Sequence, residues 1–162
     1  MDARNLDVRR ELAPGDALYP PAVLAAPGLA IVGTRRITPY GAAVTELAAR
    51  IAVASGLTVI SGGALGCDQC AGWEALRQDG KHIIVLGCGA DVVYPRTSAP
   101  LIERALATGG AVVSLVPWGC DPRPYLFPRR NRVIAALARA VFVGEAGMPS
   151  GTFSTAEAAD AI

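Results

Sequence analysis

The stretch LTVISGG, residues 57–63, shows most clearly how this chain folds. A short apolar run without polar alternation is typical of a strand buried on both faces of a parallel sheet. The Ser-Gly-Gly that follows predicts a tight turn at the carboxyl end of that strand. Similar runs, each followed by glycine or ending at serine, predict further strands over 29–32, 82–86, 111–113 and 140–143.

Segments with a helical period separate these runs. Within residues 40–55, apolar side chains recur at spacings of three and four residues, which is typical of one face of a helix. Comparable patterns predict helices over 68–79, 99–108, 130–139 and 150–162. Strand and helix alternating in this way predict an α/β fold: a doubly wound, mostly parallel sheet in a three-layer αβα arrangement.

The length and composition fit one domain. The chain has 162 residues, of which 52% are hydrophobic and 18% charged, so it can form a sizeable core and is not disordered. We interpret residues 1–28, which are charged at first and then broken by prolines, as a lead-in, and residues 29–162 as the domain. Because the sequence stops inside a predicted helix, we expect the natural chain to continue past Ile162.

Composition also limits the location and the partners. No apolar run approaches the ~20 residues that span a bilayer, and the charged first residues do not resemble a signal peptide. We therefore expect a cytoplasmic protein with no membrane partner. A net charge of +1 gives no overall attraction to nucleic acid, so any such binding must come from a local patch.

Three turns that follow predicted strands carry groups suited to anions. Ligands of a doubly wound sheet bind beyond the carboxyl ends of its strands, where these turns lie. Glycine lets backbone N–H groups approach a phosphate, and hydroxyl and guanidinium groups can bind it directly. Ordinary strand-to-helix turns and helix caps remain the structural alternative. The candidates are Gly33, Thr34 and Arg35, then Ser61, Gly62 and Gly63, and finally Ser150, Gly151 and Thr152.

The stretch 121–139 is locally basic, with five arginines and the single acid Asp121. Phe127 can stack on a base, while Arg129, Arg130 and Arg132 can hold the backbone of a nucleic acid. The amino end of a helix disfavours cations, so arginines at a predicted helix start favour an anionic ligand. Two further aromatic residues, Trp118 and Tyr125, lie nearby in the sequence.

The remaining polar residues give weaker signals. We expect Asp68 to cap the helix that follows it by accepting backbone N–H bonds. Cys67 and Cys70 have redox spacing, but a lone pair is a poor zinc signal. The sequence has one histidine, His82, and no pair of acids stands out as a general acid–base couple. We therefore expect no catalytic residue, no metal and no cofactor.

Taken in order, these motifs resemble those of the DNA-processing protein A (DprA, Smf) family. Several independent motifs in the right order are far stronger evidence of a family than any one motif. The resemblance covers about Tyr19 to Ala159. Its segments are GTR at 33–35, TPYG at 38–41, SGGALGCD at 61–68, VLGCG at 85–89, Tyr94–Pro95, Phe127, RNR at 130–132, Glu145–Ala146 and SGT at 150–152.

The resemblance implies an extended Rossmann-like domain that binds single-stranded DNA, protects it and helps to load the recombinase RecA. It further implies a role in DNA uptake and natural transformation, and a homodimer. Its basic DNA pocket would use Arg35, the Ser61–Gly63 loop, Phe127 and residues 129–132, with Asp68, Asn131 and Glu145 organising the pocket. This chain departs from the family at Leu65, where an arginine is common, and at Gly72, where a histidine is usual. The family's flanking helical and winged-helix-like domains are absent from these residues.

Two other hypotheses remain open. The first is a nucleotide N-glycoside hydrolase resembling the LOG phosphoribohydrolases, whose motif Pro-Gly-Gly-x-Gly-Thr-x-x-Glu is matched only at Pro149, Gly151 and Glu157. The second is a nucleotide-sensing module that uses the same loops for a mononucleotide. The Arg-Asn-Arg segment fits a polymer better than either, so single-stranded DNA binding is our leading hypothesis.

Overall fold

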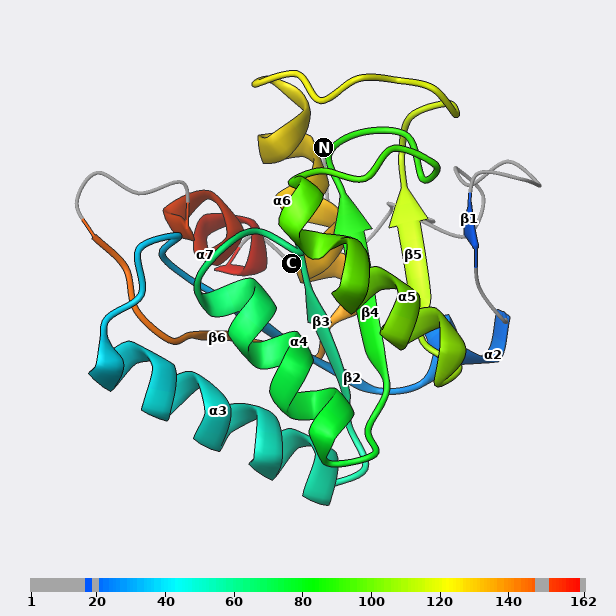
Figure 1. Cartoon of the computed structure of the whole chain (residues 1–162). Coiled ribbons are helices and arrows are strands. Elements are labelled where there is room, and N and C mark those ends of the chain that lie inside the picture. Colours follow the sequence, from blue (N-terminus) through cyan, green and yellow to red (C-terminus); the bar gives the residue numbers. More distant parts are fainter. Residues whose placement is uncertain (1–16, 19–20, 148–151, 161–162) are drawn as a thin grey trace.

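The computed structural model describes residues 17–18, 21–147 and 152–160, and its centre is a six-stranded sheet with the order β1-β5-β4-β3-β2-β6 (Figure 1). Strand β1 runs antiparallel to β5, and every other neighbouring pair is parallel. The predicted mostly parallel α/β sheet is therefore confirmed. The strands are β1 (Ala17–Leu18), β2 (Gly28–Val32), β3 (Thr58–Ser61), β4 (His82–Leu86), β5 (Ala111–Ser114) and β6 (Ala140–Val143).

Helices cover both faces of the sheet, which gives the three predicted layers (Figure 1). On one face, α3, α4 and α5 pack against alternate strand residues such as Ile31 and Ile84. On the other face, α2 and α6 pack against the intervening residues such as Ile83 and Val85. The helices are α2 (Pro21–Ala25), α3 (Pro39–Ala54), α4 (Cys67–Arg77), α5 (Ala99–Ala107), α6 (Leu126–Leu137) and α7 (Thr152–Asp160), with a 3-10 turn η2 (Arg96–Ser98) before α5.

The largest difference from the predicted elements lies at the start of α6. The sequence pattern predicts this helix from residue 130, whereas it begins at Leu126. The first turn contains Pro128, and proline is usually a sign that a segment is not the interior of a helix. Proline is nevertheless tolerated in the first turn, so the helix can begin before it. The extra turn brings Phe127 onto the helix and places Arg130 one turn inside it.

Sequence patterns also missed β1 and α2, both of which come from the segment interpreted as a lead-in. β1 pairs with Val112 and Val113 of β5, and α2 buries Val23 in the core. These elements are two and five residues long, too short for a period of two or 3.6 residues to emerge. In the part of the chain that the structure describes, no helix has both the length and the apolar character needed to cross a bilayer.

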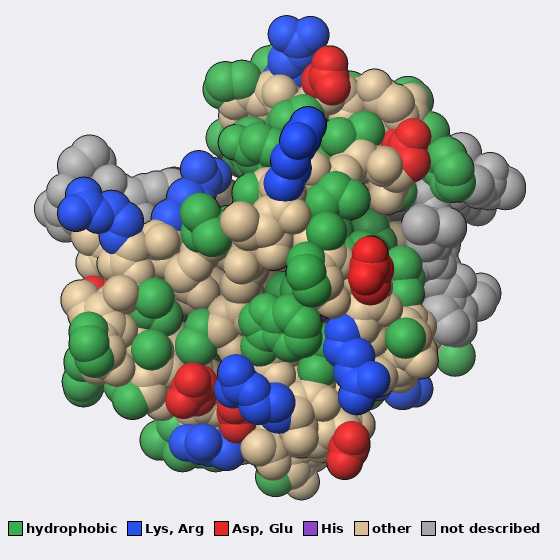
Figure 2. All heavy atoms as spheres, in the orientation of Figure 1, with side chains coloured by type: hydrophobic (Ala, Val, Ile, Leu, Met, Phe, Trp, Pro, Cys, Tyr) green, Lys and Arg blue, Asp and Glu red, His purple; other side chains and the backbone are tan. Residues whose placement is uncertain are grey.

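The parallel arrangement sets the place of the candidate site. Strands β2 to β6 all end at the same edge of the twisted sheet, and the arrows of β4 and β5 point to it at the top of Figure 1. Lys and Arg side chains are spread over the face seen in Figure 2 and mixed with acidic ones, without one broad basic field. The chain has a net charge of only +1, so recognition of an anion must depend on a local arrangement of groups.

Candidate nucleic-acid interface

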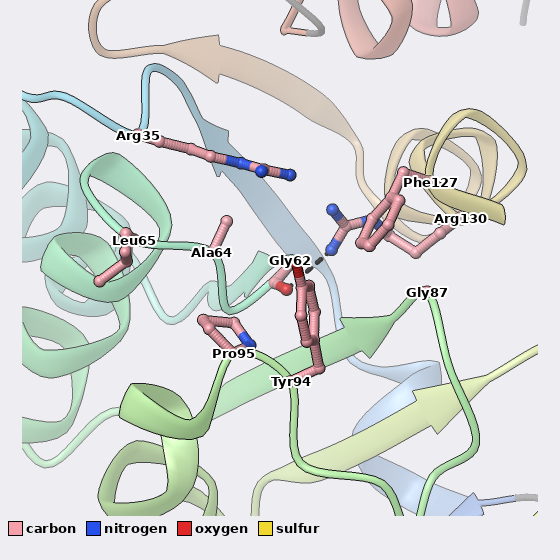
Figure 3. Close-up of a pocket in the computed structure, with 9 residues that line it drawn as sticks. All are labelled: Arg35, Gly62, Ala64, Leu65, Gly87, Tyr94, Pro95, Phe127 and Arg130. Carbon is pink, nitrogen blue, oxygen red and sulfur yellow. Dashed lines mark hydrogen bonds between the residues drawn. The ribbon is translucent and has the colours of Figure 1, made fainter. Parts of the chain in front are cut away.

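A pocket of about 90 Å³ opens at the carboxyl edge of the sheet (Figure 3). It lies where the turns after β2, β3 and β4 meet the first turn of α6. We call it the central pocket. Its lining residues are Arg35, Gly62, Ala64, Leu65, Gly87, Tyr94, Pro95, Phe127 and Arg130.

The turn between β3 and α4, residues 62–66, forms the floor of the central pocket, and Asp68 holds its shape. We call this turn the glycine loop. The Asp68 Oδ2 atom accepts hydrogen bonds from the backbone N–H groups of Gly62 (2.9 Å) and Ala64 (3.4 Å). The prediction that Asp68 caps α4 is wrong, because Gly66 is the N-cap residue and no side chain caps this helix. Asp68 lies inside the first turn of α4, so its carboxylate folds back over the loop. Gly63 and Gly66 both adopt positive φ, which explains the need for glycine.

Arg130 joins this loop to β4 from the opposite side. Its side chain is only 7% exposed, and its Nη1 atom donates hydrogen bonds to the carbonyl oxygens of Gly62 (2.7 Å) and Val85 (2.8 Å). Its Nε atom donates to Oδ1 of Asn131 (3.0 Å). A Cβ atom on Gly62 would meet Arg130 Nη1, so position 62 has no room for a side chain. Arg130 is thus a buried structural clamp as well as a lining residue.

Asp68 and Arg130 form a buried pair of opposite charges. Burial raises the pKa of the Asp68 carboxyl above its usual range, while the charge of Arg130 and the two backbone N–H bonds oppose that rise. Burial lowers the pKa of Arg130, and the positive charge of Arg35 adds to this effect. Asp68 offsets the charge of Arg130 in the interior, whereas Arg35 is an exposed cation at the rim.

Phe127 lies close to both of these arginines. The Cζ atoms of Arg35 and Arg130 lie 5.8 Å and 5.7 Å from the centroid of its ring, within the range of cation–π attraction. Figure 3 shows Arg35 extending across the pocket toward Phe127 and Arg130. Two guanidinium groups and an aromatic face therefore converge on one space. Like charges brought together in this way favour an anionic ligand between or beside them.

Tyr94 completes the aromatic wall, although in the sequence it stands out only as part of the family motif. Its ring centroid lies 5.9 Å from that of Phe127, with the two planes at 48°. Tyr94 is eight residues past the end of β4, at the far end of a long loop. Ligands are expected at the turns directly after strands, so this expectation does not predict Tyr94 as a site residue. The only sequence signal was the Tyr-Pro pair in its place among the other motifs.

Two residues that were predicted to bind the ligand shape the site but do not line the central pocket. Gly33 and Thr34 are half-buried. The Thr34 N–H donates to the carbonyl oxygen of Glu145 (2.7 Å), and its hydroxyl oxygen accepts from the N–H of Arg36 (3.1 Å). These bonds shape the β2–α3 turn that presents Arg35. The two residues thus help to fix the position of that side chain.

Ser61 does not reach the central pocket. Its side chain is completely buried, and its hydroxyl oxygen lies 3.3 Å from the carbonyl oxygen of Asp68 and 3.4 Å from Nε2 of His82. The prediction that this hydroxyl contacts a phosphate is not supported, because no ligand atom can reach it beneath the loop. The Ser61–His82 contact is not a hydrolytic pair either, since both side chains are fully buried and the other ring nitrogen of His82 bonds to the carbonyl oxygen of Val59.

Glu145 and Asn131 occupy places that fit the organising role expected of them. The Glu145 Oε2 atom accepts hydrogen bonds from the N–H (2.8 Å) and the hydroxyl (3.1 Å) of Thr38, the N-cap residue of α3. A Cβ atom on Gly41 would meet this carboxylate. Glu145 therefore ties the end of β6 to the start of α3, beside the turn that carries Arg35. Asn131 accepts the Nε–H bond of Arg130.

Among the described residues, the others that were predicted to bind the ligand do not line the central pocket. Arg129 and Arg132 are exposed on α6, and Arg129 lines a smaller hollow that shares Gly87 and Arg130 with the central pocket. Arg132 lines neither. Ser150 and Gly151 lie outside the described residues, and Thr152 is placed only as the first residue of α7. The third anion-binding turn therefore stays a prediction.

Cys67 and Cys70 lie in surroundings that suppress thiolate chemistry. Burial raises the pKa of the Cys70 thiol to about 11, and burial also raises that of Cys67. The Cys70 thiol faces the carbonyl oxygen of Ala42 at 3.7 Å. Within residues 17–18, 21–147 and 152–160, no three His, Cys, Asp or Glu side chains group as metal ligands would. These residues therefore give no support to a metal or thiol site.

The sequence and the fold match those of known proteins. The sequence model of the family described as DNA recombination-mediator protein A matches residues 20–162. This chain belongs to that family. Across the curated relatives, the protein Smf of Synechocystis is 43% identical over 134 residues, which are 83% of this chain and 33% of the relative. The chain spans less than half the length of the curated relatives that it matches.

Solved structures of family members share this fold. DNA processing protein A from Streptococcus pneumoniae matches 99% of this chain and 57% of its own, with a TM-score of 0.82 and 33% identity. The protein from Helicobacter pylori matches 92% of this chain and 70% of its own, with a TM-score of 0.79 and 31% identity. The latter structure was described for its mode of single-stranded DNA binding. The sequence-based assignment to the DprA/Smf family and its Rossmann-like fold is thus confirmed.

Proposed function

We propose that this chain binds single-stranded DNA in the central pocket and catalyses no reaction there. The observation on which the proposal depends is that the guanidinium groups of Arg35 and Arg130 both lie close to the Phe127 ring, at 5.8 Å and 5.7 Å from its centroid. An aromatic face stacks on a base of any sequence, and guanidinium groups hold phosphates. Both are needed for a strand of DNA and are offered here within one pocket.

The division of labour between the two arginines follows from their burial. Arg130 is 7% exposed and already bonded to two carbonyl groups, so it contributes mainly a fixed positive field and the shape of the floor. Arg35 is exposed at the rim, where a phosphate can approach it from solvent. We therefore assign the main phosphate contact to Arg35, with Arg129 as a second contact on the neighbouring side of α6.

The wider role proposed is that of a recombination mediator that loads RecA and acts in natural transformation as a homodimer. This part depends on the family, whose description names a recombination mediator. The H. pylori relative supports the choice of ligand, because its structure was described for single-stranded DNA binding. A base-releasing enzyme or a mononucleotide sensor would use the same pocket, and the experiment below separates these functions.

The test is fluorescence anisotropy with labelled oligo-dT at two salt concentrations. We expect tight binding that weakens steeply as salt rises, because bound phosphates release counterions. Arg35→Ala should weaken binding to all sequences alike and lower the slope of log K against log salt by about one unit. Arg104→Ala is the matched control, since Arg104 lies in the last turn of α5, away from the pocket.

Three outcomes would overturn the proposal. The first is wild-type protein that does not bind oligo-dT at low salt. The second is tight, length-independent binding of a single nucleotide, which would identify a sensor. The third is release of free base from nucleoside monophosphates, which would identify an enzyme.

A further inference from the structure

Helix α3 exposes its largest apolar side chains to solvent. Tyr40 is 75% exposed, Leu47 51% and Ile51 57%, and the helix lies along the outside of its layer at the lower left of Figure 1. The face of α3 that is buried consists of small residues: Gly41, Thr45, Ala48, Ala49 and Ala52. A helix normally turns its large apolar residues toward the core, so the reverse arrangement indicates a face that is suited to a partner.

The exposed apolar residues belong to one continuous stripe. The half-buried Val44 and the exposed Ala54 extend it along the same side of the helix. Together the stripe residues follow one another at steps of four and three, a repeat of roughly 3.5 residues by which two helices pack along a common seam. At the usual rise of an α-helix the stripe is about 21 Å long. We call it the α3 stripe, and its members are Tyr40, Val44, Leu47, Ile51 and Ala54.

The α3 stripe is complementary to itself when two copies of the helix run antiparallel. A two-fold axis at Leu47 places this residue against Leu47 of the second copy, because a two-fold interface uses the same patch on both chains. The same axis sets Val44 against Ile51 of the second copy, and the large Tyr40 against the small Ala54. A parallel pair would instead place Tyr40 against Tyr40 at one end and Ala54 against Ala54 at the other, which packs unevenly.

The charges beside the stripe fit the same antiparallel arrangement. No charged residue interrupts the α3 stripe, but Glu46 and Arg50 lie four residues apart along one flank of it. The two-fold axis brings Arg50 of one copy within about one helical turn of Glu46 of the other, a gap that a long arginine side chain can bridge. Arg50 already contacts Glu74 of its own chain at 3.5 Å, and its side chain is still 48% exposed. Opposite charges therefore meet twice beside the apolar seam.

We propose that two copies of this chain associate through the α3 stripe, with α3 antiparallel to α3 of the second copy. This inference deepens the homodimer proposed above and rests on that proposal. A seam of this length buries less than a standard protein interface, so the dimer dissociates on dilution. α3 begins at Pro39, four residues after Arg35, so the antiparallel pair places the two central pockets at opposite ends of the seam. Each pocket then holds a separate segment of DNA.

The test is analytical ultracentrifugation of the protein without DNA, from the nanomolar to the high micromolar range. The wild-type mass should rise from one chain toward two as the concentration increases. Leu47→Glu and Leu47→Lys should each stay monomeric, because the two-fold axis places two like charges against each other. An equal mixture of the two variants should dimerise again, because opposite charges then face each other across the axis. A dimer formed through another surface would not respond in this way.

Val93→Glu is the matched control, because Val93 is an apolar residue that is 41% exposed outside α3, and this variant should dimerise like the wild type. Circular dichroism checks that each variant folds, and Ile51→Glu should also abolish the dimer if a Leu47 variant does not fold.

The outcomes separate this inference from the proposed function. A Leu47→Glu dimer as tight as the wild type, or a mixture that stays monomeric, would overturn the inference and leave a homodimer through another surface. A wild-type protein that is monomeric at every concentration would overturn the inference and the homodimer together. Binding of oligo-dT in the anisotropy experiment tests the DNA-binding function independently of all three results.

Discussion

Replacing Arg130 with alanine should destabilise the whole domain and not merely weaken binding. The Arg130 side chain gives two charge-assisted bonds, to the carbonyl oxygens of Gly62 (2.7 Å) and Val85 (2.8 Å). Its charge also offsets that of the buried Asp68. Loss of these two bonds, which leaves two buried carbonyl groups unpaired, together with loss of the charge that offsets Asp68, should cost about 3–5 kcal/mol.

Urea unfolding followed by circular dichroism measures this effect. With an m value of about 2 kcal/mol/M, a loss of about 4 kcal/mol lowers the unfolding midpoint by roughly 2 M. Arg132→Ala is the control, since Arg132 is exposed on the same helix. An exposed substitution of this kind should change the stability by less than about 0.5 kcal/mol.

The stability that Arg130→Ala loses relative to wild type should depend on pH in a definite direction. Burial raises the pKa of Asp68, and loss of Arg130 raises it further. A carboxyl whose pKa is raised by folding favours the folded state in acid, and this contribution is lost as pH rises through the folded-state pKa. Arg130→Ala should therefore lie closest to wild type in acid and furthest from it at neutral pH. Equal midpoints for Arg130→Ala and wild type at pH 7 would refute this interpretation of Arg130 as a clamp.

Three further predictions concern the framework around the pocket. Gly72→Ala should cost about 1–3 kcal/mol in thermal unfolding, because its Cβ atom would lie 2.6 Å from His82 Nε2, whereas Gly147→Ala, with no atom nearby, is the control. Burial lowers the pKa of His82 to about 4, so its NMR resonances should not titrate near pH 6.5, and stability should fall as pH drops from 6.5 toward 4. A titration midpoint near 6.5 would contradict this. Glu145→Ala should cost about 1 kcal/mol through loss of the bonds to Thr38 and should weaken oligo-dT binding; unchanged binding would remove Glu145 from the organising set.

The strands and most helices could be predicted from the sequence because their signals are local. The predicted strands 82–86 and 140–143 coincide with β4 and β6, and α3 differs from its predicted range by one residue at each end. Strand β1 could not be found in this way. Its two residues are placed by pairing with β5, a partner about 95 residues away in sequence, and no local period encodes that contact.

The sequence predicted where the candidate site lies but not which of its residues are exposed and which are buried and structural. Arg35 and Phe127 lie where the sequence placed them, at the edge where the strands end. Arg130 looked like one more surface cation, since a sequence does not show that a partner such as Asp68 will be buried with it. Ser61 looked like a ligand because it follows a strand, but its side chain points into the interior. Burial depends on which face of the chain packs, and three-dimensional packing alone decides that.

Photocrosslinking tests the central claim most directly. Oligo-dT carrying 5-iododeoxyuridine is irradiated with the wild-type protein, and the crosslinked residues are located by mass spectrometry. Binding in the central pocket predicts crosslinks at Phe127 and Tyr94, which disappear when unlabelled oligo-dT competes. Crosslinks confined to residues far from the carboxyl edge of the sheet would contradict it.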